Sequence, residues 1–122
     1  MATILIVEDN PANMKLATFV LQSAGHTVVS ATDAETGMAR AHDAAPALIL
    51  MDIQLPGIDG LTATTLLKQA AETRDIPVIA LTALAMKGDE DRIRSAGCDG
   101  YIAKPIRYPE LLAMVAGYLA AT

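Results

Sequence analysis

The sequence predicts an α/β fold in which five parallel strands form one sheet and helices cover both of its faces. Short, continuous apolar runs such as Ile4 to Val7 and Leu48 to Met51 are typical of strands buried on both faces. Segments with helical periodicity separate these runs, and capping or turn residues mark most of the boundaries. This alternation of strand and helix favours successive βαβ units with right-handed connections.

The first strand is expected from Thr3 to Val7. Asn10 then offers a helix N-cap before Pro11, and this helix should run to a stop at Gly25. The residues on its inner face are predicted to be Ala17, Val20, Leu21 and Ala24. Phe19 falls on the outer face, where it is either a tolerated exposed aromatic or a partner contact; we weigh the two equally.

The second unit begins with a less hydrophobic strand from Thr27 to Ala31, as expected at a sheet edge. Thr32 and Glu35 have the spacing of a capping box, which predicts a second helix that ends near Asp43. A strongly apolar strand from Ala47 to Met51 follows and should lie at the centre of the sheet.

Asp59 can cap a third helix, which should begin at Gly60 or Leu61 and end at about Thr73. The next buried strand is predicted from Ile76 to Leu81, directly before Thr82.

The segment from Ala83 to Ala96 has a weaker signal, because Gly88 interrupts it and charged residues crowd a short helix with little apolar face. A last, short strand is expected from Tyr101 to Ala103. Pro109 should open the final helix. The residues that helical spacing places on its inner face are Leu111, Leu112, Val115, Tyr118 and Leu119.

Weak outer strands and strong inner strands fit the doubly wound, flavodoxin-like arrangement with strand order 2-1-3-4-5. The predicted architecture is therefore a three-layer (βα)5 sandwich. In this order the topology reverses between the first and third strands, and ligands of such sheets bind outside the carboxyl ends of the strands at that reversal.

Acidic side chains follow the two strands that flank the reversal. Glu8 and Asp9 come after the first strand, and Asp52 comes after the third. Clustered carboxylates repel each other unless a cation joins them, and Mg²⁺ prefers hard oxygen ligands of this kind. Thr82 and Lys104 follow the last two strands and should complete the rim.

This set of groups can support phosphoryl transfer. A carboxylate such as Asp52 can attack phosphorus to form an aspartyl phosphate. We expect Mg²⁺ to be held by Asp9, Asp52 and the carbonyl of Gln54, with Glu8 acting through a water molecule. Lys104 would add a positive charge for a phosphoryl oxygen.

The Thr82 hydroxyl would donate a hydrogen bond to the same group. Taken singly, an aspartate after a strand is usually a turn former, and a lysine before proline is usually a solvated side chain. The combination of three acids, a threonine and a lysine at strand carboxyl ends favours the functional interpretation.

Length and composition restrict the remaining possibilities. A chain of 122 residues predicts one domain, residues 1–122. The absence of a long apolar run or a signal region, together with a lone cysteine, Cys98, predicts a soluble, cytoplasmic protein without a disulfide framework. A net charge of −5 argues against direct nucleic-acid binding.

Several motifs resemble the receiver domain of bacterial two-component response regulators. They are I-V-E-D-N at residues 6–10, M-D-I-Q-L-P-G-I-D-G at 51–60, T-A at 82–83 and K-P at 104–105. The resemblance implies that Asp52 is the phosphoacceptor, that Glu8 and Asp9 form the acidic pair, and that Thr82 and Tyr101 are switch residues. It also implies a cis peptide bond before Pro105.

The segment A-M-K-G-D-E-D-R-I-R-S-A-G-C at residues 85–98 looks particularly like single-domain DivK-type regulators and the receiver modules of hybrid kinases. We expect a stand-alone regulator; the alternative is a module cut from a hybrid histidine kinase.

The resemblance implies a histidine kinase or a histidine phosphotransfer protein as the donor, a downstream protein target, and a monomeric chain without membrane contact. The face formed by the fourth helix, last strand and fifth helix should carry the output. The candidate partner-binding residues are Met14, Phe19, Met86, Arg92, Arg107 and Tyr108.

Two other functions would use the same architecture. A flavodoxin-like electron carrier needs a neutral or hydroxyl-rich loop after the first strand, where this chain has Glu8 and Asp9. An aspartyl-phosphate phosphatase of the haloacid dehalogenase type has a second acid two residues after its nucleophile, and Gln54 stands there instead. Phosphorylation of the protein itself, rather than turnover of a substrate, is therefore the predicted activity.

Overall fold

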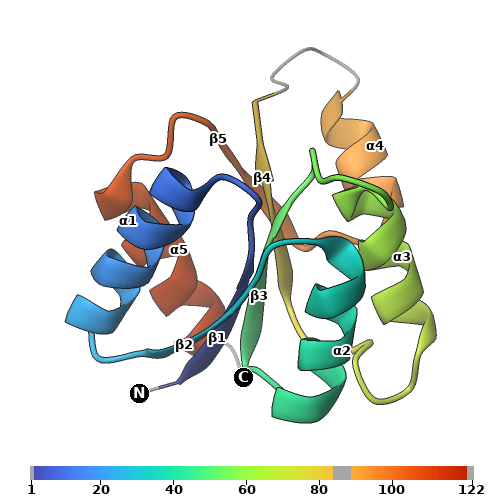
Figure 1. Ribbon diagram of the computed structural model, residues 1–122, viewed down its shortest axis with the longest axis horizontal. Coiled ribbons are helices and arrows are strands. Elements are labelled where there is room, and N and C mark those ends of the chain that lie inside the picture. Colours follow the sequence, from blue (N-terminus) through green and yellow to red (C-terminus); the bar gives the residue numbers. More distant parts are fainter. Residues whose placement is uncertain (1, 84–88, 121–122) are drawn as a thin grey trace.

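The computed structural model describes residues 2–83 and 89–120, in which strands and helices alternate from end to end (Figure 1). The strands are β1 (Thr3–Val7), β2 (Thr27–Ala31), β3 (Leu48–Asp52), β4 (Val78–Thr82) and β5 (Gly100–Ala103). The helices are α1 (Pro11–Ser23), α2 (Ala34–Ala44), α3 (Gly60–Gln69), α4 (Asp89–Ser95) and α5 (Tyr108–Ala120).

The strands form one parallel sheet in the order β2-β1-β3-β4-β5, which confirms the predicted topology. The less hydrophobic strand β2 lies at an edge, as expected. Val7 of β1 lies opposite Met51 of β3, so the residues that follow them, Glu8 and Asp52, leave the sheet side by side.

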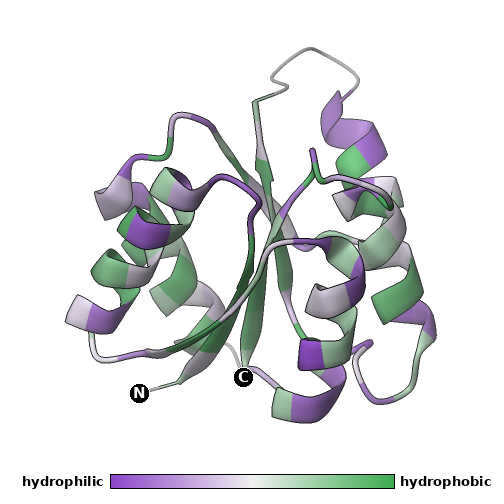
Figure 2. Cartoon of the chain, viewed as in Figure 1, coloured by the Kyte–Doolittle hydropathy of each residue, from purple (hydrophilic) through white to green (hydrophobic). Residues whose placement is uncertain are grey.

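Two hydrophobic layers cover the sheet, because successive strand residues point to opposite faces. On β1, Leu5 and Val7 pack toward α2, α3 and α4, whereas Ile4 and Ile6 pack toward α1 and α5. Figure 1 shows this division, with α1 and α5 on one side of the sheet and the other helices opposite. The central strands are hydrophobic except at their carboxyl ends, where β3 ends in Asp52 and β4 in Thr82, whereas α4 is largely hydrophilic (Figure 2).

The start of α1 agrees with the prediction, and its end does not. The Asn10 side chain accepts hydrogen bonds from the backbone N–H groups of Ala12 and Asn13, as an N-cap does. Ala24 is exposed, because α1 ends at Ser23 and Ala24 has left the helical conformation. The prediction that Ala24 faces inward was therefore wrong.

Ala17 and Leu21 are buried as predicted, and Val20 is half-buried. Phe19 points outward and is 68% exposed.

The capping box predicted for the second helix was also wrong. Asp33, not Thr32, is the N-cap of α2, and its carboxylate accepts a hydrogen bond of 2.7 Å from the backbone N–H of Thr36. Asp33 has the extended backbone that a cap requires, with φ −144° and ψ 166°. The chain thus needs two residues, not one, to turn from β2 into the helix.

Helix α3 begins after the predicted cap, Asp59, but ends at Gln69 rather than near Thr73. The residues that follow form turns. The hydroxyl of Thr73 in these turns donates to the carbonyl of Leu67 in α3, and the ammonium of Lys68 in α3 donates to the carbonyl of Ile76. The Thr73 hydroxyl thus satisfies the Leu67 carbonyl, which a longer helix would have bonded to a backbone N–H. Strand β4 accordingly begins at Val78, two residues later than predicted.

The C-terminal elements are close to those expected. In α4, Ile93 is the buried residue, which accords with the weak signal of this segment. Met86 and Gly88 lie outside the described residues. Helix α5 begins at Tyr108, and its inner face buries Leu111 and Val115.

The other residues predicted for that face, Leu112, Tyr118 and Leu119, are half-buried. Among the described helices, none combines the length and the hydrophobicity needed to cross a bilayer.

Candidate functional site

Three carboxylates meet at the carboxyl edge of the sheet, as predicted. Glu8 directly follows β1, Asp9 comes next, and Asp52 is the last residue of β3. One carboxylate oxygen from each of these residues lies within 4.8 Å of the others. Glu8 and Asp52 are only 2% and 3% exposed, whereas Asp9 faces solvent. The carboxylate cluster is therefore open to solvent at Asp9 and buried at Glu8 and Asp52.

Both carboxylate oxygens of Asp52 have hydrogen-bond donors. The backbone N–H of Gln54 donates to Oδ1 over 3.0 Å, and the ammonium of Lys104 donates to Oδ2 over 3.0 Å. The first donor lies in the loop after β3, and the second lies after β5. Since donors on both sides restrict its rotation, the carboxylate has a defined orientation.

Lys104 also binds Glu8, with 3.0 Å between Nζ and Oε1. Burial alone would lower the pKa of Lys104, but the hydrogen bonds to Asp52 and Glu8 and the charges of these two groups raise it. Lys104 is therefore a fixed cation between the two acids. Its peptide bond to Pro105 is cis, which confirms the expectation, and its backbone N–H donates to the carbonyl of Thr82.

Glu8 is the most strongly perturbed acid of the site. Burial raises its pKa from 4.5 to about 7, and Asp52 contributes in the same direction while Lys104 opposes the change. Its second oxygen, Oε2, is buried and has no hydrogen-bond partner. A buried, unpaired oxygen among carboxylates is the kind of group that a cation would satisfy.

The donor set fits Mg²⁺. It consists of carboxylate oxygens from Glu8, Asp9 and Asp52, and hard oxygen donors with access to solvent suit this ion. The solvent-facing position of Asp9 leaves room for the water molecules that Mg²⁺ usually retains.

The predicted switch residues lie at the same edge of the sheet or close to it. Thr82 ends β4 and is 1% exposed. Tyr101 lies on β5 opposite Ala80, is half-buried, and packs against the core layer that contains Ile93 of α4. The two residues thus lie on neighbouring strands.

The candidate partner-binding residues do not form one patch. Phe19 on α1 is exposed, whereas Met14 on the same helix is half-buried against the core. Tyr108 helps line a pocket of about 520 Å³ beside Lys104. The residues of this pocket are Asn13, Leu16, Lys104, Pro105, Ile106 and Tyr108.

Arg107 is exposed in the segment that leads into α5. Arg92 is exposed on α4, on the other side of the sheet from α1, and pairs with Asp89 over 3.4 Å. Met86 lies outside the described residues.

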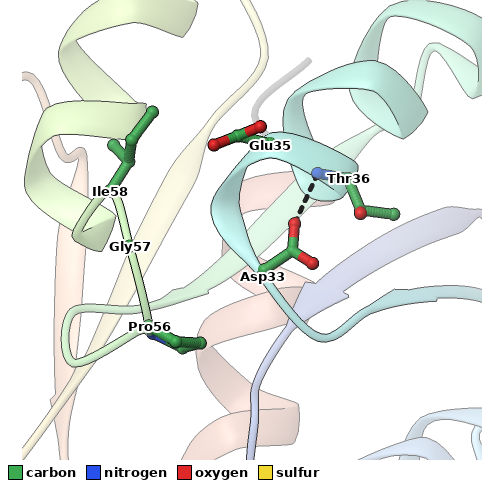
Figure 3. A pocket seen from close by; sticks show the side chains of 6 residues that line it. All are labelled: Asp33, Glu35, Thr36, Pro56, Gly57 and Ile58. Atoms are coloured by element: carbon green, nitrogen blue, oxygen red, sulfur yellow. Dashed lines mark hydrogen bonds between the residues drawn. The ribbon is translucent and has the colours of Figure 1, made fainter.

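Sequence reasoning missed two features of this region. The first is the direct bridge from Lys104 to both acids. The second is a pocket of about 390 Å³ between the start of α2 and the loop after β3. Figure 3 shows Asp33, Glu35 and Thr36 on the α2 side and the loop residues 56–58 on the other. Neither feature has a signal in the sequence, because each depends on how distant segments pack.

Comparison with known proteins agrees with this geometry. The family model described as the response regulator receiver domain matches residues 4–116. The chain is 46% identical over 117 residues to the polar-differentiation response regulator DivK of Brucella anthropi, covering 96% of this chain and 95% of that protein.

Two solved structures are also similar to it. The receiver domain of sensor histidine kinase PA1611 from Pseudomonas aeruginosa PAO1, with a magnesium ion coordinated in its active-site cleft, has a TM-score of 0.91, 35% identity and 98% coverage of both chains. A response regulator from Chloroflexus aurantiacus has a TM-score of 0.93, 32% identity and 98% coverage of both chains. The chain therefore belongs to the response regulator receiver domain family, whose members are phosphoacceptor switches of two-component signalling.

Proposed function

We propose that Asp52 accepts a phosphoryl group from a phosphohistidine of a histidine kinase or phosphotransfer protein, with the help of Mg²⁺. The observation that carries this proposal is the Asp52 carboxylate itself, which is 3% exposed, lies among the acids Glu8 and Asp9, and is oriented by hydrogen bonds from Gln54 and Lys104. This is the arrangement of a positioned nucleophile rather than of a turn residue.

In the transfer step, a carboxylate oxygen of Asp52 forms a bond to phosphorus while the bond from phosphorus to the donor nitrogen breaks. The electron pair of the broken bond stays on the imidazole. The Lys104 ammonium, which donates a hydrogen bond to Asp52 Oδ2, would contact an incoming phosphoryl oxygen and balance part of its negative charge. Asp9, Asp52 and the carbonyl of Gln54, with Glu8 acting through water, would hold Mg²⁺, which would supply further positive charge to the phosphoryl group.

The reaction modifies the protein itself, so the chain acts as a switch that catalyses its own phosphorylation and dephosphorylation rather than as an enzyme with an external substrate. Thr82 is the group proposed to respond, because its hydroxyl would be drawn toward the phosphoryl group. Tyr101 on the neighbouring strand would then turn inward and alter the surface of α4, which carries Arg92, and the chain around the start of α5, where Arg107 and Tyr108 lie.

A phosphohistidine donor must reach Asp52 from the open side of the site. Leu16 of α1 helps line the pocket beside Lys104 and is 49% exposed, and Phe19, one turn further along α1, is 68% exposed. Apolar side chains next to a reactive crevice favour docking of a protein over binding of a small molecule. We therefore assign the donor to the α1 face. Met14 would contribute less to this contact, because it is already half-buried in the core.

The phosphoacceptor assignment is tested by incubating the protein with Mg²⁺ and a small acyl phosphate and measuring its intact mass. We expect one added phosphoryl group, which is absent in Asp52→Asn and after chelation of the metal. Asp59→Asn is the matched control, because it makes the same change in the same loop and keeps a residue that can cap α3. Equal labelling of Asp52→Asn and the native protein would disprove the assignment.

The donor face is tested with Phe19→Ala in phosphotransfer from a panel of purified histidine kinases and phosphotransfer proteins. Transfer from the protein donor should slow, whereas labelling by a small acyl phosphate should not change, because the small donor needs no docking surface. Leu66→Ala, at an exposed leucine on α3, is the control. Equal slowing of Leu66→Ala, or an equal loss with the small donor, would contradict this role of Phe19.

A further inference from the structure

Gly60, the first residue of α3, lies directly against the backbone of Asp52. It is buried, and its N–H donates to the carbonyl of Ile53 over 2.9 Å. A Cβ atom at this position would overlap with the carbonyl oxygen of Asp52 and would lie 2.9 Å from both the carbonyl carbon of Asp52 and the Cα of Ile53. The close approach therefore excludes every residue except glycine.

The neighbouring segments hold α3 and β3 in place, so this overlap has no easy relief. The obstructing atoms belong to the backbone of a strand that is paired on both sides, and the N–H of Ile53 is bonded to the carbonyl of Leu81. On the other side, Ala63 is fully buried and the Thr65 hydroxyl donates to the carbonyl of Ala96 over 3.1 Å. A side chain at position 60 would thus displace the end of β3.

The end of β3 also sets the orientation of the Asp52 carboxylate. The hydrogen bond from Gly60 to Ile53 closes the base of the loop, and the next residue of this loop is Gln54, whose N–H donates to Asp52 Oδ1. We propose that Gly60 is a positioning residue for phosphoryl transfer: the contact that only glycine allows holds the Gln54 amide where it orients Asp52. This inference rests on the proposed function of Asp52.

The test compares Gly60→Ala with two other glycine-to-alanine variants, one with a clash far from the crevice and one without a clash. Gly100→Ala introduces a milder clash, 2.6 Å from the side-chain hydroxyl oxygen of Tyr118, at the amino end of β5 and away from the crevice. Gly117→Ala on α5 places its Cβ in open space. Each variant is assayed well below its melting temperature for labelling by a small acyl phosphate and for the amide chemical shift of Gln54.

We expect Gly60→Ala to lower the phosphorylation rate constant at saturating Mg²⁺ by about tenfold or more. We also expect it to shift the Gln54 amide resonance before any donor is added. Gly100→Ala should lose stability but keep both the rate and the Gln54 resonance. Gly117→Ala should also keep both and should gain stability, because alanine is the better helix former at this exposed position.

A Gly60→Ala protein with the native rate, or with an unshifted Gln54 amide, would overturn the proposal, and so would an equal loss of rate in Gly100→Ala. If the native protein is not labelled, the proposed function of Asp52 fails. The Gln54 amide shift in Gly60→Ala then tests by itself whether Gly60 positions the Gln54 amide. If Gly60→Ala does not fold, Thr65→Val replaces it, because it removes the hydroxyl that bonds the carbonyls of Leu61 and Ala96 and so loosens α3 beside Asp52. An unchanged Gln54 resonance in Thr65→Val would then count against the proposal.

Discussion

At the scale of single residues, Glu8 distinguishes this site from a simple cluster of surface acids. Its side chain is almost completely buried, and burial raises its pKa to about 7. In the metal-free protein near neutral pH, Glu8 therefore alternates between a neutral acid and a carboxylate paired with Lys104. A bound cation would favour the carboxylate, so metal binding and proton release are linked at this residue.

We predict that the metal-free protein becomes less stable as the pH rises from about 4.5 to about 7. The pKa of Glu8 is higher in the folded than in the unfolded protein, so the folded state binds more protons in this range and loses stability as they leave. The total loss is up to about 3–4 kcal/mol, since the pKa changes from 4.5 to about 7 and one pKa unit corresponds to about 1.4 kcal/mol. Urea denaturation at a series of pH values, without divalent metal, measures this.

Glu8→Gln should remove this pH dependence, because an amide does not titrate. Glu35→Gln, at an exposed glutamate on α2, should retain it. Saturating Mg²⁺ should make the stability of the native protein depend less steeply on pH, since the ion favours ionised Glu8 at lower pH. Equal slopes for Glu8→Gln and the native protein would show that another group is responsible.

At the scale of elements, caps and turns decide where the helices begin, and they also explain the errors in prediction. Thr32 and Glu35 have the spacing of a capping box, yet the chain is still turning from β2 at Thr32 and becomes helical only at Ala34. The residue with extended backbone immediately before a helix is its cap, and here that residue is Asp33. The Thr36 N–H lowers the pKa of the Asp33 carboxyl, as such a bond should.

We predict that Asp33→Ala lowers the melting temperature at neutral pH, whereas Thr32→Ala has little effect. The first variant leaves the Thr36 N–H without its acceptor, and the second removes an exposed side chain that does not cap the helix. Thermal unfolding followed by circular dichroism measures both. A larger drop in melting temperature for Thr32→Ala than for Asp33→Ala would instead support the capping box predicted from the spacing of Thr32 and Glu35.

At the scale of the whole molecule, the two ends of the sheet have different roles. The carboxyl end holds the acids and Lys104, whereas the amino end is fastened by a polar network around Asp99. Asp99 Oδ2 accepts hydrogen bonds from the Lys68 ammonium over 3.0 Å and from the N–H of Val78 over 2.8 Å. The Tyr118 hydroxyl donates to the Asp99 carbonyl. This network joins α3, β4, β5 and α5 at the end opposite the crevice.

We predict that Lys68→Met lowers the free energy of unfolding by about 1–3 kcal/mol, because it removes the donor that serves Asp99 and the carbonyls of Arg74 and Ile76. The phosphorylation rate with a small acyl phosphate should not change, since this donor lies at the other end of the sheet. Lys15→Met, at an exposed lysine on α1, is the control for stability. A slower phosphorylation in folded Lys68→Met would show that the two ends are coupled.

Local patterns in the sequence were sufficient for the sheet and for the type of site. The apolar runs that became β1 and β3 need no distant information, since a strand buried on both faces must be hydrophobic throughout. The caps Asn10 and Asp59 follow from local hydrogen bonding. The strand order then places Glu8 beside Asp52, because both residues lie at the carboxyl ends of strands that flank the reversal of the topology.

What the sequence by itself determined is therefore the alternation of elements, the topology and the acids at the strand ends, all of which depend on periodicity and turn chemistry. Only the tertiary structure decided that Lys104 binds both Glu8 and Asp52, that Glu8 is buried deeply enough to titrate near neutral pH, and that Gly60 touches the Asp52 backbone. These properties depend on distances and solvent exclusion between residues far apart in the chain, which no local pattern encodes.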